Sequence, residues 1–130
     1  MRKTAVNPFD WHEADDQCVV VEGVRRIAFV SGQTSISNDG QVRHAGDMLA
    51  QTQLTLDNVE TVLKAAGMDF SNIVHMNTCT TDVDRFRAEA AGPMAARLAM
   101  FDVRPPGVLS QVVRLGLPEL LIEIEVTAAA

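Results

Sequence analysis

The sequence predicts an α+β fold in which a mixed β-sheet is covered on one face by two helices. Three observations support it: short β-branched and apolar stretches end at turn residues, two segments place apolar residues at helical spacing, and the segments run strands, helix, strand, helix, strands. Strand–helix–strand connections need parallel neighbours and short hairpins give antiparallel ones, so we expect a mixed sheet. A chain of 130 residues is expected to form one domain, residues 1–130.

Five segments are predicted to be strands because they are rich in β-branched and apolar residues. Residues 18–22 and 26–31 are expected to pair as a hairpin, since Gly23 and a few residues separate them. The remaining predicted strands are residues 73–80, 108–114 and 119–127.

The first helix is the clearest element of the sequence. Its apolar stripe, at spacings of three and four residues, consists of Leu49, Thr52, Leu56, Val59, Leu63 and Ala66. Asp47 is a suitable N-cap, and Gly67 stands where a left-handed residue ends many helices.

A second helix is predicted to begin at Asp82 or Asp84. Its apolar face consists of Phe86, Ala90, Met94 and Leu98. Pro93 follows Gly92 inside this segment and removes a backbone donor, so we expect a kink or two short helices.

Two helices cover about one face of a five- or six-stranded sheet, because packed helices are 8–10 Å apart and strands about 4.8 Å apart. In the last strand, Leu120, Ile122, Ile124 and Val126 share the parity expected to face the helices. The opposite parity holds Leu121, Glu123, Glu125 and Thr127. The bare face is either covered by loops or buried between subunits, and we favour subunits in closed symmetry.

Composition disfavours several classes of function. The formal net charge is −6 and the basic residues are scattered, which disfavours nucleic acids and anionic membranes as partners. No apolar run is long enough to span a membrane, and the N-terminus lacks the apolar region of a signal peptide. Cys18 and Cys79 match no metal-binding or redox motif, so we expect reduced thiols, a cytoplasmic protein and no metal site.

Several segments, in order along residues 15–128, resemble the Rid (YjgF) family. Ser31-Gly32-Gln33 resembles the end of a family strand, and Thr80-Thr81-Asp82 with Phe86 resembles a strand-to-helix junction. The resemblance to the helix and its entry covers residues 40–51 and 58–68, and residues 122–125 with Ala128 resemble the C-terminal signature.

This resemblance implies a chorismate-mutase-like fold and a homotrimer whose ligand clefts lie between subunits. It also implies a small-molecule ligand, a keto acid or an imine. The activity implied is hydrolysis of enamine and imine intermediates, such as 2-aminoacrylate, to a keto acid and ammonia. No metal or organic cofactor is expected.

The sequence departs from the family at the cleft. The arginine that binds the substrate carboxylate in the deaminase branch corresponds to Gly107, which has no side chain. The family tyrosine falls at Cys18 and the family cysteine at Leu109, whereas Ser31 and Glu123 match.

Each candidate residue has a functional and a structural interpretation. Glu123 is predicted to activate water for attack on an imine carbon, or else to be a solvated strand carboxylate. Arg104 would bind an acidic ligand or form a loop salt bridge. Cys18 would either line the cleft or be buried in the core. Ser31 would either form a hydrogen bond with a ligand or satisfy backbone groups at the end of its strand. Arg114 is interpreted as structural.

Three functions follow from these residues. The first is an imine hydrolase using Glu123, and the second is a non-catalytic small-ligand trimer, favoured by Gly107 and Leu109. The third is a ribonuclease, which the acidic balance disfavours.

Overall fold

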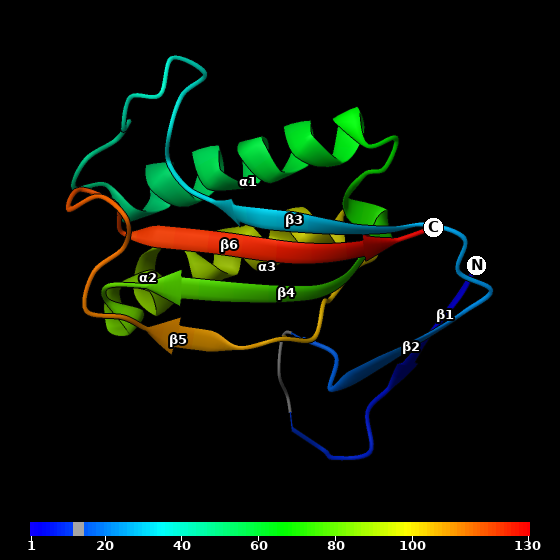
Figure 1. Ribbon diagram of the computed structural model, residues 1–130. Helices are drawn as coiled ribbons and strands as arrows, with labels where there is room; N and C mark the ends of the chain where they lie inside the picture. Colours follow the sequence, from blue (N-terminus) through cyan, green and yellow to red (C-terminus); the bar gives the residue numbers. More distant parts are fainter. Residues whose placement is uncertain (12–14) are drawn as a thin grey trace.

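The computed structural model describes residues 1–11 and 15–130 and shows a mixed four-stranded sheet with the helices on one face (Figure 1). A two-stranded hairpin, β1 (Arg2–Val6) and β2 (Cys18–Glu22), lies beside it as a separate sheet. In spatial order, the larger sheet consists of β3 (Ile27–Gln33), β6 (Ile122–Ala129), β4 (Ile73–Thr80) and β5 (Leu109–Gln111). The predicted α+β fold with a mixed sheet is confirmed.

The C-terminal strand β6 lies at the centre of the sheet. It runs antiparallel to both β3 and β4, while β4 and β5 are parallel. The connection from β3 through the first helix to β4 therefore leaves room for one strand, which β6 fills. The register places Glu123 directly opposite Cys79 and Glu125 opposite Asn77.

Helix α1 (Met48–Ala65) agrees with its prediction at both ends. The Asp47 side chain accepts a hydrogen bond from the Ala50 N–H at 2.9 Å, as an N-cap does. Gly67 has φ +74° and the Met68 N–H donates to the Leu63 carbonyl, so the chain leaves the helix through a left-handed residue. Within residues 1–11 and 15–130, no helix is long and apolar enough to cross a membrane.

The second helical segment is two short helices, α2 (Val83–Glu89) and α3 (Ala91–Ala99). Asp82 caps α2 by accepting from the Arg85 N–H at 3.0 Å. Pro93 falls in the first turn of α3, where no intrahelical donor is needed. The expected alternative of two short helices is therefore the observed one, and a short 3₁₀ turn (Phe70–Asn72) precedes β4.

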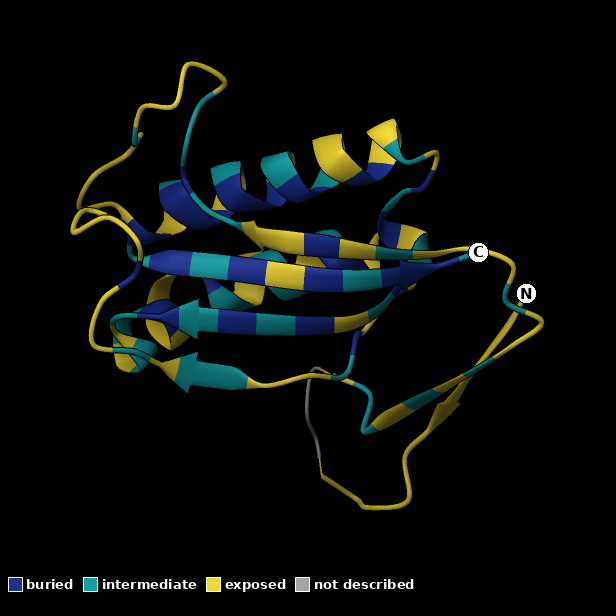
Figure 2. Cartoon of the chain, viewed as in Figure 1, coloured by how far each residue is buried: buried dark blue, intermediate teal, exposed yellow. Residues whose placement is uncertain are grey.

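The core lies between the sheet and the helices, and Figure 2 shows the alternation of buried and less buried residues along the strands. In β6, Ile122, Ile124 and Val126 are buried, which confirms the face predicted for this parity. The half-buried Glu123 and the exposed Glu125 consequently lie on the helix-free face.

The predicted hairpin between residues 18–22 and 26–31 is wrong. Strand β2 (Cys18–Glu22) pairs with β1 (Arg2–Val6), a strand that the sequence did not suggest, and β3 pairs with β6. The reason is that the backbone N–H groups of Arg25 and Arg26 donate to the Ala130 carbonyl at 2.7 and 2.9 Å. These bonds direct the chain after Gly23 to the C-terminus instead of back along β2.

The last two strands differ in length from their predictions. Residues 108–114 were expected to be extended, but β5 covers only Leu109–Gln111, and Val113 beyond it is fully exposed. Residues 119–127 were expected for the final strand, whereas β6 covers Ile122–Ala129 because a turn closed by the Leu120 N–H and the Leu117 carbonyl comes first.

Candidate functional site

The helix-free face of the sheet carries a row of polar groups around Glu123. Cys79 of β4 lies opposite Glu123, and Ser110 of β5 lies beside Cys79 in the parallel register. One pair further along β6, the Asn77 amide donates to the Glu125 carboxylate at 2.9 Å. We call Asn77, Cys79, Ser110, Glu123 and Glu125 the open-face cluster.

Glu123 is held in place by the strand beside it. A Cβ on Gly32 would lie 2.2 Å from the Glu123 Oε1 atom, so only glycine leaves room for this carboxylate against β3. The pairing of β3 with β6 is also irregular between Val30 and Gln33, as in a β-bulge. The Ser31-Gly32-Gln33 motif thus leaves the space that the Glu123 carboxylate occupies.

Negative charge affects the thiol of the open-face cluster. Burial raises the pKa of Cys79 above its usual value of 9.0, and the carboxylates of Glu123 and Glu125 raise it further. A protonated thiol is a poor nucleophile, so Cys79 is suited to packing beside Glu123 rather than to covalent catalysis.

Gly107 is fixed by its close approach to β4. A Cβ at this position would lie 1.6 Å from the Met76 carbonyl oxygen, so the backbone leaves no space for any side chain. The flanking residues are bonded to the same strand, since the Met76 N–H donates to the Pro106 carbonyl and the Thr78 N–H to the Val108 carbonyl. The Val108 N–H also donates to the Asn77 side chain at 3.1 Å.

Leu109 does not meet Glu123 within one chain. It lies opposite the buried Thr78 and packs against the core on the helix side of the sheet. Together with Gly107, it lines a hollow of about 440 Å³ beside Phe86 and Met94 of the helices. The single chain therefore does not bring Leu109 and Glu123 to the same face of the sheet.

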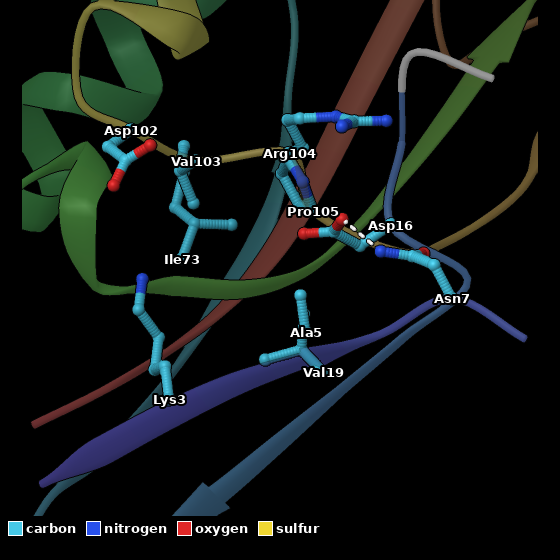
Figure 3. Close-up of a pocket in the computed structure, with 10 residues that line it drawn as sticks. All are labelled: Lys3, Ala5, Asn7, Asp16, Val19, Ile73, Asp102, Val103, Arg104 and Pro105. Carbon is cyan, nitrogen blue, oxygen red and sulfur yellow. Dashed lines mark hydrogen bonds between the residues drawn. The ribbon is translucent and has the colours of Figure 1, made fainter. Parts of the chain in front are cut away.

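Arg104 lines a different cavity, of about 450 Å³, between the β1–β2 hairpin and the chain that follows α3 (Figure 3). Its carbonyl accepts a hydrogen bond from the Asp16 N–H at 2.9 Å, which ties the hairpin to this chain. At the opposite end, the Lys3 ammonium donates to the Ser71 carbonyl. Burial lowers the pKa of Lys3, against the attraction of Asp102, Asp69 and Asp16.

Two other predicted ligand-binding residues lie apart from the cavity of Arg104. Cys18 begins β2, is exposed, and belongs to the hairpin sheet rather than to the larger sheet. Ser31 is exposed in the irregular part of β3, where its carbonyl accepts from the Gln33 amide at 3.0 Å. Six residues were predicted to form the site, and within one chain only Ser31 and Glu123 of these lie on adjoining strands, β3 and β6. They lie at the same end of the sheet, and Gly32, next to Ser31, adjoins the Glu123 carboxylate.

Three further residues, His12, Arg114 and Trp11, lie outside the open-face cluster or outside the described residues. His12 lies in the segment that is not described. The Arg114 guanidinium donates to the Leu115 carbonyl at 3.3 Å, and Trp11 stacks on Phe9 with ring centres 4.6 Å apart. Over residues 1–11 and 15–130, no group of three or more His, Cys, Asp and Glu side chains could hold a metal ion.

Sequence reasoning missed Gly32, which adjoins the Glu123 carboxylate, and three other residues of the open-face cluster, Asn77, Cys79 and Ser110. Asn77 and Cys79 share the parity of the open face in β4, and this parity is visible in the sequence. The role of Gly32 depends on the register between β3 and β6, which the wrong hairpin prediction concealed.

Known proteins share this fold and much of its sequence pattern. The profile of the family described as Endoribonuclease L-PSP matches residues 16–130. A Yersinia pestis protein of the conserved Rid family, YyfB, has a structure with a TM-score of 0.83 at 27% identity, with all of both chains covered. The chain is a member of the Rid family.

Three further proteins are similar to this chain. The YjgF gene product of E. coli superimposes with a TM-score of 0.71 at 28% identity, covering 96% of this chain and 90% of that one. Protein DfrA of Myxococcus xanthus is 33% identical over 61 residues, 47% of each chain. The 2-iminobutanoate/2-iminopropanoate deaminase of Capra hircus is 31% identical over 72 residues, 55% of this chain and 50% of the deaminase. The matches thus span about half the length of these curated relatives.

Proposed function

We propose that this Rid-family protein hydrolyses reactive imine and enamine intermediates, with Glu123 as the group that activates water. The products are ammonia or an amine and a carbonyl compound, which is a keto acid when the imine carries a carboxylate. The observation that carries the proposal is the Glu123 carboxylate, seated against Gly32 on the helix-free face next to the protonated Cys79 thiol. The goat relative named as an imine deaminase supports the same class of reaction.

The chemistry needs one base and no redox step. Water adds to the imine carbon, its proton passes to the Glu123 carboxylate, and the π electrons of the C=N bond move to nitrogen. Glu123 returns that proton to the nitrogen, which gives the neutral carbinolamine. The C–N bond then breaks, the hydroxyl proton passes through Glu123 to the leaving amine, and the carbonyl forms. Neither a metal nor an organic cofactor takes part in the proposed reaction.

The proposed site lies in clefts between the subunits of a homotrimer. Large apolar side chains are exposed in and beside the sheet, with Phe29 of β3 at 80% exposure and Val108, just before β5, at 61%. Phe29 lies on the helix-free face, because its neighbour Val30 is buried on the other face. An apolar face of this kind is expected at a subunit interface. Cys18, Ser31, Gly107 and Leu109 would then be combined between chains, whereas Arg104 stays in the cavity beside the hairpin. We place the trimer in the cytoplasm.

The activity is tested by generating imines from amino acids with an amino-acid oxidase and trapping the unhydrolysed imine with semicarbazide. The protein is expected to hydrolyse the imine and so to suppress its trapping. The Glu123→Gln variant should hydrolyse the imine at least about 100-fold more slowly. The Glu119→Gln variant, changed at an exposed carboxylate, should keep the native rate. Suppression by Glu123→Gln equal to that of the native chain would remove Glu123 from the mechanism. Light scattering after gel filtration tests the trimer, and a monomer at micromolar concentration would contradict it.

A second function, a non-catalytic trimer that carries or senses a small metabolite, is favoured by one observation. The backbone at Gly107 excludes every side chain, so no cationic group can stand at that position of the cleft. Thermal shifts with small carbonyl compounds, without any effect on imine trapping, would support this function over hydrolysis. Ribonuclease activity has less support, because β3, β4, β5 and β6 contain no Lys or Arg to neutralise phosphates.

A further inference from the structure

The four-stranded sheet has an unusual distribution of charge. Strands β3, β4, β5 and β6 contain no Lys or Arg, and their only carboxylates are Glu123 and Glu125. Both carboxylates lie on the helix-free face, because the residues between and beside them are buried. Within these strands, the face around Glu123 therefore has acidic groups and no permanent cation.

The negative charge of these carboxylates also acts on Cys79. Burial is the first cause of its raised pKa, and the nearby charges of Glu123 and Glu125 add to it. The same field that disfavours a thiolate would disfavour a bound carboxylate and favour a bound cation.

No cationic side chain can offset this negative charge from position 107, just before β5. The Gly107 Cα lies against the Met76 carbonyl, and the adjoining backbone is hydrogen-bonded to β4 on both sides. The nearest guanidinium in sequence belongs to Arg104, which lines the cavity under the hairpin together with Lys3, Asp16 and Asp102 (Figure 3).

We infer that the imine bound at the open-face cluster lacks a carboxylate and binds as a protonated, positively charged iminium. This inference rests on the proposed function and narrows its substrate class. Glu125, held by Asn77, stabilises the positive charge of the iminium, while Glu123 takes the proton of the attacking water. The products are a neutral aldehyde or ketone and an ammonium ion. The name of the goat relative, by contrast, gives two imines that carry a carboxylate.

The test compares two imines that differ only at the imine carbon. One is the preformed imine of methylamine with benzaldehyde, and the other is that of methylamine with phenylglyoxylate, in which a carboxylate replaces the hydrogen. Hydrolysis is followed by ultraviolet absorbance with the full chain and with buffer alone. The rate enhancement over buffer is expected to be at least about tenfold larger for the benzaldehyde imine, since like charges a few ångströms apart repel.

A charge-removing variant links the preference to this face. Glu125→Gln keeps an acceptor for the Asn77 amide but removes one negative charge, so the ratio of the two enhancements is expected to fall about three- to tenfold. The exposed Glu119→Gln is the matched control and is expected to leave the ratio unchanged.

The outcomes separate this inference from the proposed function. Equal enhancement of both imines, or faster hydrolysis of the phenylglyoxylate imine, would overturn the inference and leave imine hydrolysis standing. A ratio unchanged in Glu125→Gln would overturn the role of the open-face charge. If neither imine is hydrolysed faster than in buffer, and amino-acid imines are not either, the proposed function itself fails and the inference with it.

Discussion

The Glu123 carboxylate occupies the space that a side chain on Gly32 would need. A Cβ on Gly32 would lie 2.2 Å from Oε1 and 2.8 Å from Cδ of Glu123. The two residues come from neighbouring antiparallel strands, β3 and β6, and meet where their pairing becomes irregular. Glycine at position 32 thus sets the position of the only half-buried carboxylate in the described strands of the sheet.

Gly32→Ala is expected to displace Glu123 without unfolding the protein. The carboxylate is the far end of a flexible side chain and can rotate away, so the free energy of unfolding should change by less than about 1 kcal/mol. Imine hydrolysis should fall by roughly tenfold to 100-fold, because a base displaced by about 1 Å is poorly aligned. Rates and urea denaturation are measured for both this variant and Gly116→Ala, where a Cβ meets nothing within 4 Å. Full activity in Gly32→Ala would show that the position of Glu123 beside Gly32 is unimportant for hydrolysis.

Gly107→Ala is expected to behave differently, because the clash there is with backbone. The Met76 carbonyl cannot move without breaking the pairing of β4, so we expect a loss of about 2 kcal/mol or more in the free energy of unfolding. Gly107→Arg should lose at least as much and should gain no hydrolysis of carboxylate-bearing imines. Urea denaturation beside Gly116→Ala provides the comparison, and equal stability of the two alanine variants would refute the clash.

The Cys79 thiol is expected to react with iodoacetamide only at high pH. Burial and the charges of Glu123 and Glu125 raise its pKa above 9.0, so the thiolate fraction at neutral pH is small. The rate at Cys79, measured by mass spectrometry of peptides in Cys18→Ser, should rise with an inflection above pH 9.0. Glu125→Gln should move the inflection to lower pH. An inflection below 9.0 in the native chain would contradict the acidic field.

Glu60 is expected to make stability depend on pH. Its pKa is lowered, first by the hydrogen bond from Lys64 and also by that from Arg97, so the stabilisation is complete above the usual value of 4.5 and is lost as the pH falls through the folded value. Glu60→Gln should cost about 0.5 kcal/mol at pH 7 and almost nothing near pH 3, since partly exposed ion pairs contribute little. Urea denaturation at both pH values measures the difference. An equal cost at both would mean that packing, not charge, is responsible.

The sequence predicted best where local chemistry decides the structure. Asp47 and Gly67 bracket α1 because capping and a left-handed residue are local requirements, and the parity of Ile122, Ile124 and Val126 is a local pattern as well. The family resemblance on the same segments is confirmed by the match to residues 16–130.

The pairing of strands could not be predicted, because it depends on contacts that are distant in sequence. Residues 18–22 are equally suitable as partners for β1 or β3, and the choice is made by bonds from Arg25 and Arg26 to the carbonyl of Ala130, more than 100 residues away. The surroundings of Glu123 depend on this choice. The face of the sheet on which Leu109 lies could not be predicted for a related reason, because only the parallel register with Thr78 decides it.

Strands β1 and β2 pair only with each other. Their hydrogen bonds can therefore open without breaking any backbone hydrogen bond of the larger sheet. Among the described residues, the hydrogen bond from Lys3 to the Ser71 carbonyl and the hydrogen bond from the Asp16 N–H to the Arg104 carbonyl are two of the hairpin's links to the rest of the chain. The amides of residues 2–6 and 18–22 should therefore exchange with deuterium by a local opening of lower free energy than the unfolding that exposes β6. Two cooperative units would then coexist in a chain of 130 residues, and the cavity beside Arg104 would open and close with the weaker one.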